Sequence, residues 1–400
     1  MTPAKGCTEM KDSGIEWIGA IPAHWDILRG KNVLRLLERP VKPEDDVVTC
    51  FRDGEVTLRK NRREEGFTNS LKEIGYQGIE PGDLIVHGMD GFAGAIGISD
   101  SRGKASPVLN VMDSNQNKRY LMYYLRAMAY KDVFMALSTG IRVRSCDLRW
   151  NKLSVFPFLI PKSHEQSAIA AYLDTQCAKI DEIIAQAKAS IEDYKQWKAS
   201  IIYEAVTKGL NPNVEMKDSG VHWIGNMPIN WYLKKAKYCV SITNGSDPKS
   251  EGTVPVYGSG AESFKTCGEY KEGPAVLIGR KGATLHIPHY IEGRYWNVDT
   301  AFDVKPCEGF SLRYYYYLAC IFDYNYYISQ TTLPGMTQTN YNNMKLPCPS
   351  LDGQSAITSY LDTQCAKIDE LTSEKQSLID DLESYKKSLI YEVVTGKRRA

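Results

Sequence analysis

Two long segments of the chain carry hydrophobic residues at the spacing of a helix seam. They start at Leu173 and Leu361 and run to Gly209 and Gly396, with no Gly or Pro between. Apolar residues recur every seven positions and again three or four positions further on, which is the heptad pattern of a coiled coil. At about 1.5 Å per residue, such helices are roughly 60 Å long. The residues expected in the seam are Leu173, Ile180, Ile184, Ile191, Ile201, Leu361, Ile368, Leu371, Leu378 and Leu389.

The blocks between these segments have a different pattern. Short apolar runs with Gly and Pro between them, such as "PGDLIVHGMDGFAGAIGI" from Pro81 and "GPAVLIGRKGATLHIPHY" from Gly273, predict strands joined by tight loops. The expected class is α+β. We expect two globular domains that are separated by two long helices forming an antiparallel coiled coil. The alternative is that two amphipathic helices pack on separate cores.

Three stretches occur twice in the same order, which predicts an internal pseudo-two-fold repeat. "MKDSGIEWIGAIPAHW" from Met10 returns as "MKDSGVHWIGNMPINW" from Met216, and "YLDTQCAKIDE" stands at both Tyr172 and Tyr360. "RYLMYYL" from Arg119 resembles "RYYYYLA", so we assign these tyrosines to helix packing. The expected segments are a leader (1–27), a first domain (28–160), a central helix (161–209), a second leader (210–233), a second domain (234–349) and a distal helix with a basic tail (350–400).

Charge is distributed unevenly along the chain. Residues 28–160 hold 21 Lys and Arg against 16 Asp and Glu, a balance of +5, and residues 234–349 hold 12 against 10, a balance of +2. The net charge of the whole chain is +1, so the remaining segments sum to −6. Positive blocks are expected where the chain meets an anion, although plain surface solvation gives the same sign.

Motifs of enzymatic chemistry were not found in the sequence. There is no GxxxxGK[ST] phosphate loop, and "NPNV" at Asn211 lacks the second proline and the aromatic residue of an adenine-methyltransferase site. The ten cysteines form no CxxC pair, and no Cys/His cluster has zinc spacing. We therefore expect no catalytic residues, no metal and a non-enzymatic chain. Without a signal peptide or an apolar span, the expected location is the cytoplasm, with no membrane partner.

Two mildly basic domains on a rigid spacer suit double-stranded DNA, because Lys and Arg bind phosphates and groove-facing side chains read bases. The polar loops "IRVRS" and "TQTN" are the best candidates, since Arg suits guanine and Gln or Asn suits adenine. For the run at residues 59–63, a solvated charged loop is the alternative. The candidate DNA contacts are Arg59, Lys60, Arg62, Arg63, Arg142, Arg144, Arg149, Arg280, Lys281, Thr337, Gln338 and Asn340.

The two leaders, the two copies of the helix motif and the unlike blocks between them resemble the specificity (S) subunits of Type I restriction–modification enzymes. One departure is "DGQ" at Asp352, where the first copy has "HEQ" at His164. The resemblance implies target-recognition domains that each read one half of a bipartite, asymmetric DNA site. It also implies a coiled coil that sets the spacer and docks two methyltransferase (modification) subunits.

The resemblance further implies restriction (motor and nuclease) subunits as partners. S-adenosylmethionine, ATP and Mg²⁺ would then be bound by partner subunits, and no cofactor by this chain. Two alternatives stay open. One is a coiled-coil adaptor that binds only proteins, and the other is the specificity chain of a nuclease that cuts on both sides of its site.

Overall fold

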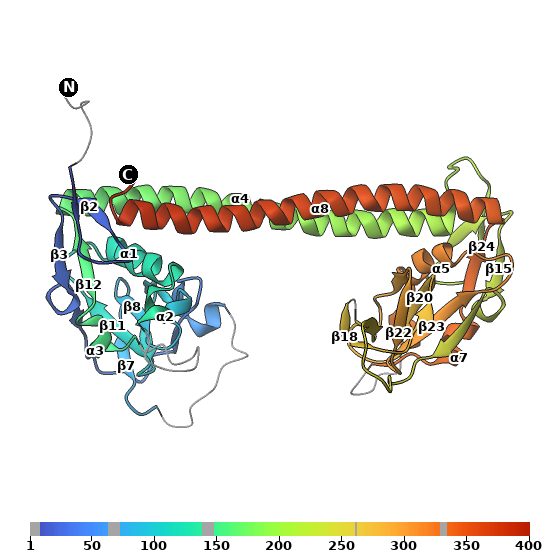
Figure 1. The fold of residues 1–400 in the computed structure, drawn as a ribbon, viewed down its shortest axis with the longest axis horizontal. Coiled ribbons are helices and arrows are strands. Elements are labelled where there is room, and N and C mark those ends of the chain that lie inside the picture. The colour runs from blue at the N-terminus through green and yellow to red at the C-terminus, as the bar shows by residue number, and fades with distance from the viewer. Residues whose placement is uncertain (1–8, 63–72, 138–147, 261, 329–333) are drawn as a thin grey trace, which may run out of the picture. The chain divides into compact units, whose positions relative to one another are not determined.

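The computed structural model describes residues 9–62, 73–137, 148–260, 262–328 and 334–400. The chain folds into two compact units. Unit 1 comprises Met1–Gln186 with Leu378–Ala400, and unit 2 comprises Ala187–Ser377. Each unit therefore contains one of the two blocks and about half of each long helix (Figure 1).

The block of unit 1 is built on a four-stranded antiparallel sheet of order β4-β11-β8-β9. These strands span Arg35–Leu36, Leu109–Asp113, Leu84–His87 and Ile96–Ile98. One face of the sheet, including Ile85 and Val111, packs in an apolar cluster with the small strand pairs β5–β6 and β7–β10. The other elements of the block are β5 (Val48–Cys50), β6 (Val56–Leu58), β7 (Gln77–Ile79), β10 (Gly103–Ala105), α1 (Lys118–Tyr130), α2 (Val133–Ala136), α3 (Trp150–Leu153) and the short 3₁₀ turns η1 (Gly30–Asn32), η2 (Arg59–Asn61) and η3 (Gly91–Ala93).

The block of unit 2 repeats this sheet with an unlike sequence. Its order is β16-β23-β20-β21, with bounds Val240–Asn244, Ala301–Pro306, Ala275–Gly279 and His289–Ile291. A second sheet of order β18-β17-β22-β19 has no equivalent of the same size among the described residues of unit 1. The other elements are β17 (Val254–Tyr257), β18 (Ser263–Cys267), β19 (Lys271–Glu272), β22 (Arg294–Asn297), α5 (Leu312–Ala319), α6 (Tyr324–Tyr327), α7 (Gln338–Asn343) and η5 (Ala236–Tyr238).

The two tyrosine-rich helices, α1 and α5, hold their blocks to the long helices. Tyr120 in α1 is fully buried, and its hydroxyl lies 2.9 Å from Leu159 O of the block and 3.4 Å from Val394 O at the end of the second long helix. Tyr314 in α5 is also fully buried and donates to Val206 O at 3.0 Å. The repeated tyrosines therefore serve helix packing, as expected from their alignment.

Each leader folds as a small hairpin followed by a strand that joins the end of its block. β1 (Met10–Asp12) pairs with β2 (Ala20–Pro22), and β13 (Met216–Asp218) pairs with β14 (Asn226–Pro228). β3 (Asp26–Arg29) then pairs with β12 (Pro157–Ile160), and β15 (Tyr232–Lys235) with β24 (Lys345–Cys348). Trp25 and Trp231 are buried at the same place in both units. The leaders are thus structural, which explains why they are duplicated.

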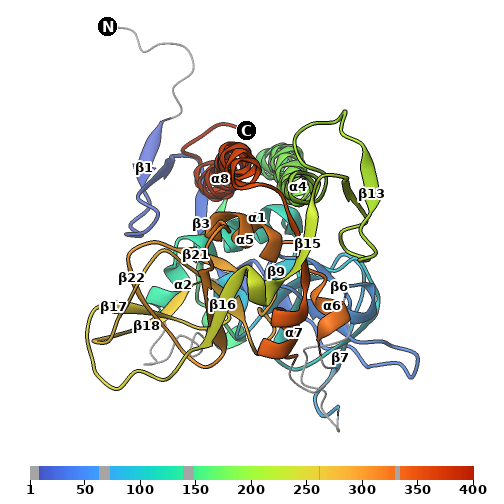
Figure 2. The same ribbon diagram turned by 90° about the vertical axis from the view of Figure 1, so that its right-hand side faces the viewer.

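The helices α4 (Ser163–Lys208) and α8 (Leu351–Val394) pack together side by side (Figures 1 and 2). They are antiparallel, because the start of α4 and the end of α8 share unit 1. Matching ion pairs join them: Lys386 to Asp181 at 2.6 Å in unit 1 and Lys198 to Asp369 at 2.7 Å in unit 2. The α+β class with two β-rich domains and two long packed helices is confirmed. In the part of the chain that the structure describes, no helix is long and apolar enough to cross a membrane.

The seam follows the expected positions in α4 but is shifted in α8. Leu173, Ile180, Ile184, Leu361, Ile368 and Leu389 are buried, and Ile191 and Ile201 are half-buried. Leu371 and Leu378 are 37% and 39% exposed, so the prediction that they lie in the seam is wrong. The buried line continues four residues after Ile368 and Lys375, through Thr372 and Ile379. Leu371 and Leu378 lie three residues after these heptad positions, whereas the seam of α8 uses a spacing of four.

A repeated cluster fixes each block to its long helix. Asp362 of α8 accepts hydrogen bonds from Arg313 (2.8 Å) and from the hydroxyl of Tyr317 (2.5 Å). Asp174 of α4 accepts from Arg119 and Tyr123 in unit 1, both at 2.7 Å. Burial, followed by the bond to Asp362, raises the pKa of Tyr317. The buried hydroxyl therefore depends on this carboxylate for a partner.

We expect Asp362→Ala to destabilise unit 2 by about 1–3 kcal/mol, because Tyr317 and Arg313 both lose their acceptor. Chemical denaturation followed by circular dichroism measures the loss. Lys367→Ala is the matched control, since Lys367 is exposed on the same helix and its loss should change stability by less than about 0.5 kcal/mol. Equal stability of the two variants would show that the cluster does not hold the block.

Candidate nucleic-acid interface

The same two loops meet at the end of the central strand in each block. After β8, Gly88 N donates to Val108 O (2.7 Å), and Leu148 N donates to Gly88 O (2.8 Å). After β20, Arg280 N donates to Thr300 O (2.8 Å), and Met336 N donates to Arg280 O (2.9 Å). The loop after the central strand is thus joined to the start of a short helix, α3 in unit 1 and α7 in unit 2. These paired loops are the equivalent surfaces of the two blocks.

In unit 1 the paired loops carry Arg149, an exposed residue that immediately precedes α3. A Cβ at Gly88 would lie 3.0 Å from Val108 O and 3.5 Å from Arg149 Cγ, so a side chain there would crowd both neighbours. The glycine therefore lets the loop approach the arginine closely. Arg142, Arg144 and Arg63, which the sequence also singled out, lie outside the described residues.

A concavity of about 700 Å³ lies in unit 1, lined by residues that include Arg52, Arg59, Arg62, His87 and Asp90. Two of its arginines have acidic partners, and the third, Arg59, donates to the Thr49 hydroxyl at 3.3 Å. Arg52 contacts Asp90 at 2.9 Å, and Arg62 contacts Glu55 at 3.0 Å. Asp53 is a second acceptor of Arg62. Burial raises the pKa of Asp53, but the Arg62 bond, the Glu55 backbone N–H and the charges of Arg62 and Arg126 together outweigh it, and the net shift is downward. The charges of Arg52 and Arg62 are therefore already balanced by carboxylates of the same block, and an anion could bind these arginines only by displacing those carboxylates.

His87 lies at the end of β8 in the same concavity. Burial lowers the pKa of its ring, an effect that Asp90 opposes and Arg52 reinforces. Its Nδ1 accepts from the backbone N–H groups of Met89 (3.2 Å) and Asp90 (2.9 Å). The ring is therefore neutral near pH 7 and orders the loop after β8. Lys60, also singled out by the sequence, is paired with Asp46 at 2.6 Å.

In unit 2 the paired loops bring Arg280 and Lys281 next to the start of α7. Their cationic groups lie 4.0 and 3.9 Å from the Asp299 carboxylate, at the outer limit of an ion pair. The Arg280 side chain also lies over the Phe302 ring, with 5.8 Å to its centroid. The side chains of Arg280 and Lys281 are both half-exposed. An anion in solution can therefore contact them.

Three further candidates in unit 2 have structural partners. Thr337 caps α7 by accepting from Asn340 N at 3.0 Å. The amide of Gln338 donates to Ile242 O, and the amide of Asn340 donates to Tyr327 O at 2.9 Å. A bidentate contact to adenine uses the same amide donors. Gln338 and Asn340 therefore serve first to fix α7 in its block.

The hydrogen bonds at Leu148 and Met336 also align the two sets of loops with each other. They give Arg149 of unit 1 the same place as Thr337 of unit 2. Sequence reasoning missed Arg52 and His87. Each directly follows a short apolar run, "VVTCF" or "LIV", and precedes a glycine-containing turn, which is the signal that could have found them.

No group of three or more His, Cys, Asp or Glu that could hold a metal ion occurs among the residues the structure places. Most of the cysteines in those residues are buried, and none forms a disulfide. The pair Cys239 and Cys348 lies with sulfur atoms 3.8 Å apart inside unit 2. The interface is thus made of cationic, amide and backbone groups.

Comparison with known proteins identifies relatives of the whole arrangement. The family model "Type I restriction modification DNA specificity domain" matches residues 237–380. The putative Type I restriction enzyme MjaX specificity subunit of Methanocaldococcus jannaschii is 22% identical, over 90% of this chain and 91% of the relative. The EcoprrI specificity subunit of Escherichia coli is 25% identical over 34% of this chain, and that match spans only about a third (33%) of the relative's length.

Solved structures show the same fold. A chain from a structural study of complex assembly and conformational transition of the type I R-M system superposes with a TM-score of 0.73, at 14% identity, covering 94% of this chain and 99% of that one. The HsdS subunit from Thermoanaerobacter tengcongensis superposes with a TM-score of 0.53 at 15% identity, covering 94% and 98%. The family match over residues 237–380, the near-full-length relative and the duplicated leaders and helices place this chain in the family of Type I restriction–modification specificity subunits, which are non-catalytic subunits.

Proposed function

We propose that this chain reads a bipartite, asymmetric DNA site, one half with each of two target-recognition domains at residues 28–160 and 234–349. The observation that carries the proposal is the shared sheet order, β4-β11-β8-β9 and β16-β23-β20-β21, around unlike loops. A common frame with different readers suits two half-sites of different sequence. Phosphate contacts would come from Lys and Arg at the paired loops, and base contacts from side chains beside them.

In this proposal the long helices, with the segments 161–209 and 350–400, set the spacer between the half-sites. α4 has 46 residues, which corresponds to roughly 70 Å of helix. The leaders 1–27 and 210–233 close the ends of the helices. Half-sites one or two turns of DNA apart, at about 34 Å per turn, are within the length of such a helix.

The proposed partners are double-stranded DNA, two methyltransferase (modification) subunits and restriction (motor and nuclease) subunits, in the cytoplasm. The methyl donor S-adenosylmethionine, ATP and Mg²⁺ would be bound by those partners. The loops described above supply hydrogen-bond donors and charge for recognition, so the work of this chain is to position the catalytic subunits on DNA. Methylation-aware sequencing of DNA from cells carrying this chain and its methyltransferase tests the proposal. Methylation at one split sequence is expected, and methylation at an unsplit sequence would overturn it.

Arg280 is the residue of unit 2 that we expect to contribute most to its half-site. Arg280→Ala should weaken binding of the assembled methyltransferase to its site by about 5- to 150-fold, or about 1–3 kcal/mol. Arg280→Lys keeps the charge but not the planar pair of donors. If Arg280 reads a base, both variants lose affinity. If it contacts only phosphate, the lysine variant binds like the wild type. Titration of labelled duplex at several salt concentrations measures this.

The matched control is Lys188→Ala, which removes one positive charge from an exposed position on α4. It should leave the affinity and its salt dependence unchanged, since the proposal places Lys188 away from the DNA-reading loops. If Lys188→Ala weakened binding as much as Arg280→Ala, the effect would be one of net charge and the assignment of Arg280 would fail.

A further inference from the structure

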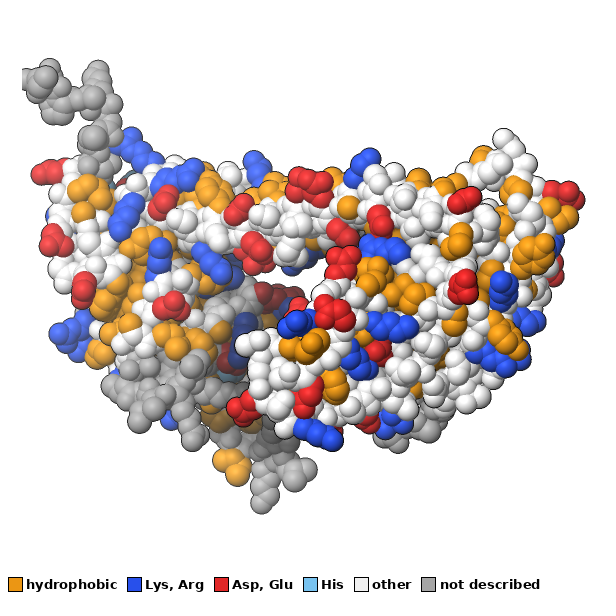
Figure 3. All heavy atoms as spheres, turned by 45° about the vertical axis from the view of Figure 1, so that its right-hand side comes forward, with side chains coloured by type: hydrophobic (Ala, Val, Ile, Leu, Met, Phe, Trp, Pro, Cys, Tyr) orange, Lys and Arg blue, Asp and Glu red, His pale blue; other side chains and the backbone are white. Residues whose placement is uncertain are grey.

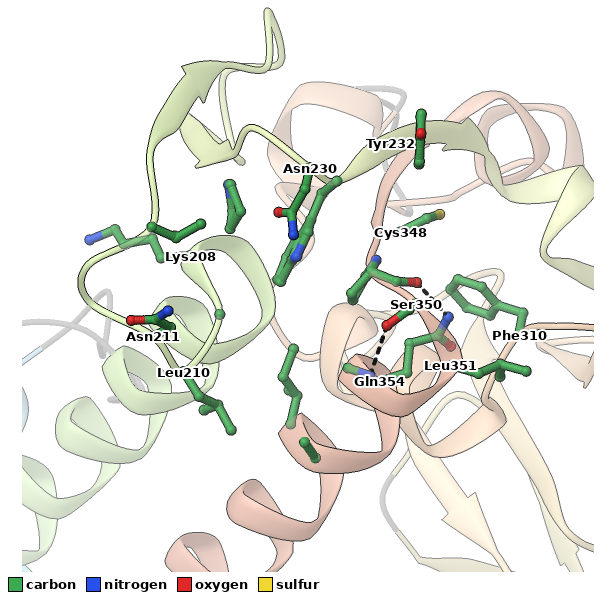
Figure 4. Close-up of a pocket in the computed structure, with 18 of the residues that line it drawn as sticks. Lys208, Leu210, Asn211, Asn230, Tyr232, Phe310, Cys348, Ser350, Leu351 and Gln354 are labelled. Carbon is green, nitrogen blue, oxygen red and sulfur yellow. Dashed lines mark hydrogen bonds between the residues drawn. The ribbon is translucent and has the colours of Figure 1, made fainter.

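Unit 2 contains a pocket of about 600 Å³ where the end of α4, the second leader and the start of α8 meet (Figure 4). Trp231, Phe310 and Ile357 contribute apolar surface to its wall, and Lys208 and Lys234 also line it. No Asp or Glu is among the lining residues, all of which belong to the described part of the chain. The pocket therefore combines apolar walls with the positive charge of Lys234 and of Lys208, whose Nζ also lies 3.8 Å from an oxygen of Glu204 on the same helix.

The corresponding place in unit 1 is bridged by the chain's own side chains. Glu165, in the first turn of α4, accepts from Lys162 N at 3.1 Å, and it lies 2.8 Å from His24 Nε2 in the first leader. Burial raises the pKa of Glu165, but the bonds from His24 and from the Lys162 backbone N–H, with the nearby histidine charges, together outweigh it, so the net shift is downward and the carboxylate is charged. A carboxylate is thus bound at this helix start in unit 1.

The repeat places Asn230 where unit 1 has His24, and Gly353 where it has Glu165. Gly353 has no side chain, so neither a carboxylate nor its histidine partner crosses the pocket. Ser350 begins the helix, and its Oγ accepts from Gly353 N at 3.2 Å, which is half of a capping box. Unit 1 supplies the other half with Glu165. The pocket of unit 2 therefore lies where unit 1 has the carboxylate of Glu165.

Exposed apolar side chains surround this opening. Leu210, Ile229, Tyr232 and Leu351 are 44%, 47%, 72% and 53% exposed. The repeat gives Ala23, Asp26 and Ser163 at the positions of Ile229, Tyr232 and Leu351. Figure 3 shows hydrophobic side chains at the surface on this end of unit 2. Exposed apolar side chains that the other repeat replaces by small or polar residues are not required by the shared fold, which favours an interaction site at this place.

We propose that this pocket binds an acidic peptide segment of a protein partner, one copy per chain. An apolar side chain of the segment enters between Trp231 and Phe310, and its carboxylates meet Lys208, Lys234 and the start of α8. The charge of the lining residues selects an acidic occupant. Because unit 1 fills the equivalent place with Glu165, a partner that uses this contact breaks the two-fold repeat and binds once. This interaction lies outside the proposed DNA reading.

The test uses the full chain and a fluorescein-labelled peptide, Glu-Leu-Glu-Leu-Glu, with Gln-Leu-Gln-Leu-Gln as the uncharged probe. Fluorescence anisotropy should show saturable binding of one acidic peptide per chain, at least tenfold tighter than the uncharged peptide. No binding of the acidic peptide at about 1 mM, equal binding of both peptides, or two sites per chain would overturn the proposal.

The decisive variant closes the pocket with the residues of unit 1, Asn230→His together with Gly353→Glu. It should reduce peptide binding at least tenfold without lowering the melting temperature, because the new glutamate completes the capping box at Ser350. A Cβ at residue 353 would lie 3.1 Å from Pro349 Cβ and 3.3 Å from Ser350 Oγ, a fit that needs shifts of a few tenths of an ångström.

Lys234→Glu is the second variant and does not fill the pocket. It should also weaken the acidic peptide at least tenfold while leaving the uncharged peptide unaffected. If the closing pair leaves binding unchanged and only the lysine variant weakens it, the peptide is held by surface charge alone and the pocket is not its site. If duplex DNA displaces the peptide, the lysines belong to the nucleic-acid surface and the proposal fails.

Discussion

Exchange of residues 28–160 for the corresponding domain of another specificity subunit should change one half of the methylated sequence completely and leave the other half as it was. The exchanged segment contains the whole sheet β4-β11-β8-β9 and its loops, whereas the leaders and the long helices stay in place. Each mismatched base pair costs about 1–3 kcal/mol, so a changed half-site of a few pairs abolishes methylation at the old sequence. Methylation-aware sequencing of the host genome measures the outcome.

The control is the reciprocal exchange of residues 234–349, which should alter only the opposite half. Binding to the partner subunits should survive both exchanges, since the packed helices are retained. A change in both halves, or in neither, would contradict the division of reading between the two blocks.

Lengthening both long helices by one heptad should lengthen the spacer between the half-sites by about three base pairs. Seven residues add about 10 Å of helix, and each base pair of DNA spans about 3.4 Å. One heptad is inserted between Trp197 and Lys198, and the other between Asp369 and Glu370. The pair Lys198–Asp369, joined at 2.7 Å, then moves as a block and the phase of the seam is preserved.

The same heptad placed in α4 alone is the control. It moves Lys198 out of register with Asp369, and every seam residue beyond it loses its partner, so the protein should lose stability rather than gain a longer spacer. Sequencing of methylated sites reads the spacer, and thermal melting reads the stability. An unchanged spacer in the doubly lengthened chain would show that the helices do not set the distance between the half-sites.

Much of the fold could be predicted because its signals are local. The run from Leu173 to Gly209 repeats mostly apolar residues at heptad spacing with no Gly or Pro inside it, and α4 ends at Lys208. The duplicated leader predicted duplicated structure, and Trp25 and Trp231 are buried alike. The errors at Leu371 and Leu378 arose where two neighbouring positions compete for the seam. The leucines lie three residues after Ile368 and Lys375, whereas the antiparallel packing buries the positions four residues after them, such as Ile379.

The candidate site could be predicted less well, because a side chain's partner is often distant in sequence. Gln338 appears as a free amide in the sequence, but its partner Ile242 lies 96 residues earlier. Arg62 belongs to a basic run, yet it contacts Asp53 and Glu55 across a turn. Hydrogen-bond satisfaction within the block therefore decided which polar residues are available, and residue type alone does not carry that information.

The sequence by itself determined the two-unit repeat, the long helices and the family, because identical stretches and heptad spacing are properties of the chain read in order. Only the tertiary structure decided that two unlike blocks share one sheet order and that Arg149 and Thr337 occupy equivalent places. It alone also decided that unit 2 has a pocket beside Gly353, at the place where Glu165 contacts His24 in unit 1. These features depend on strand pairing and on contacts between residues many positions apart. They exist only once the chain has folded.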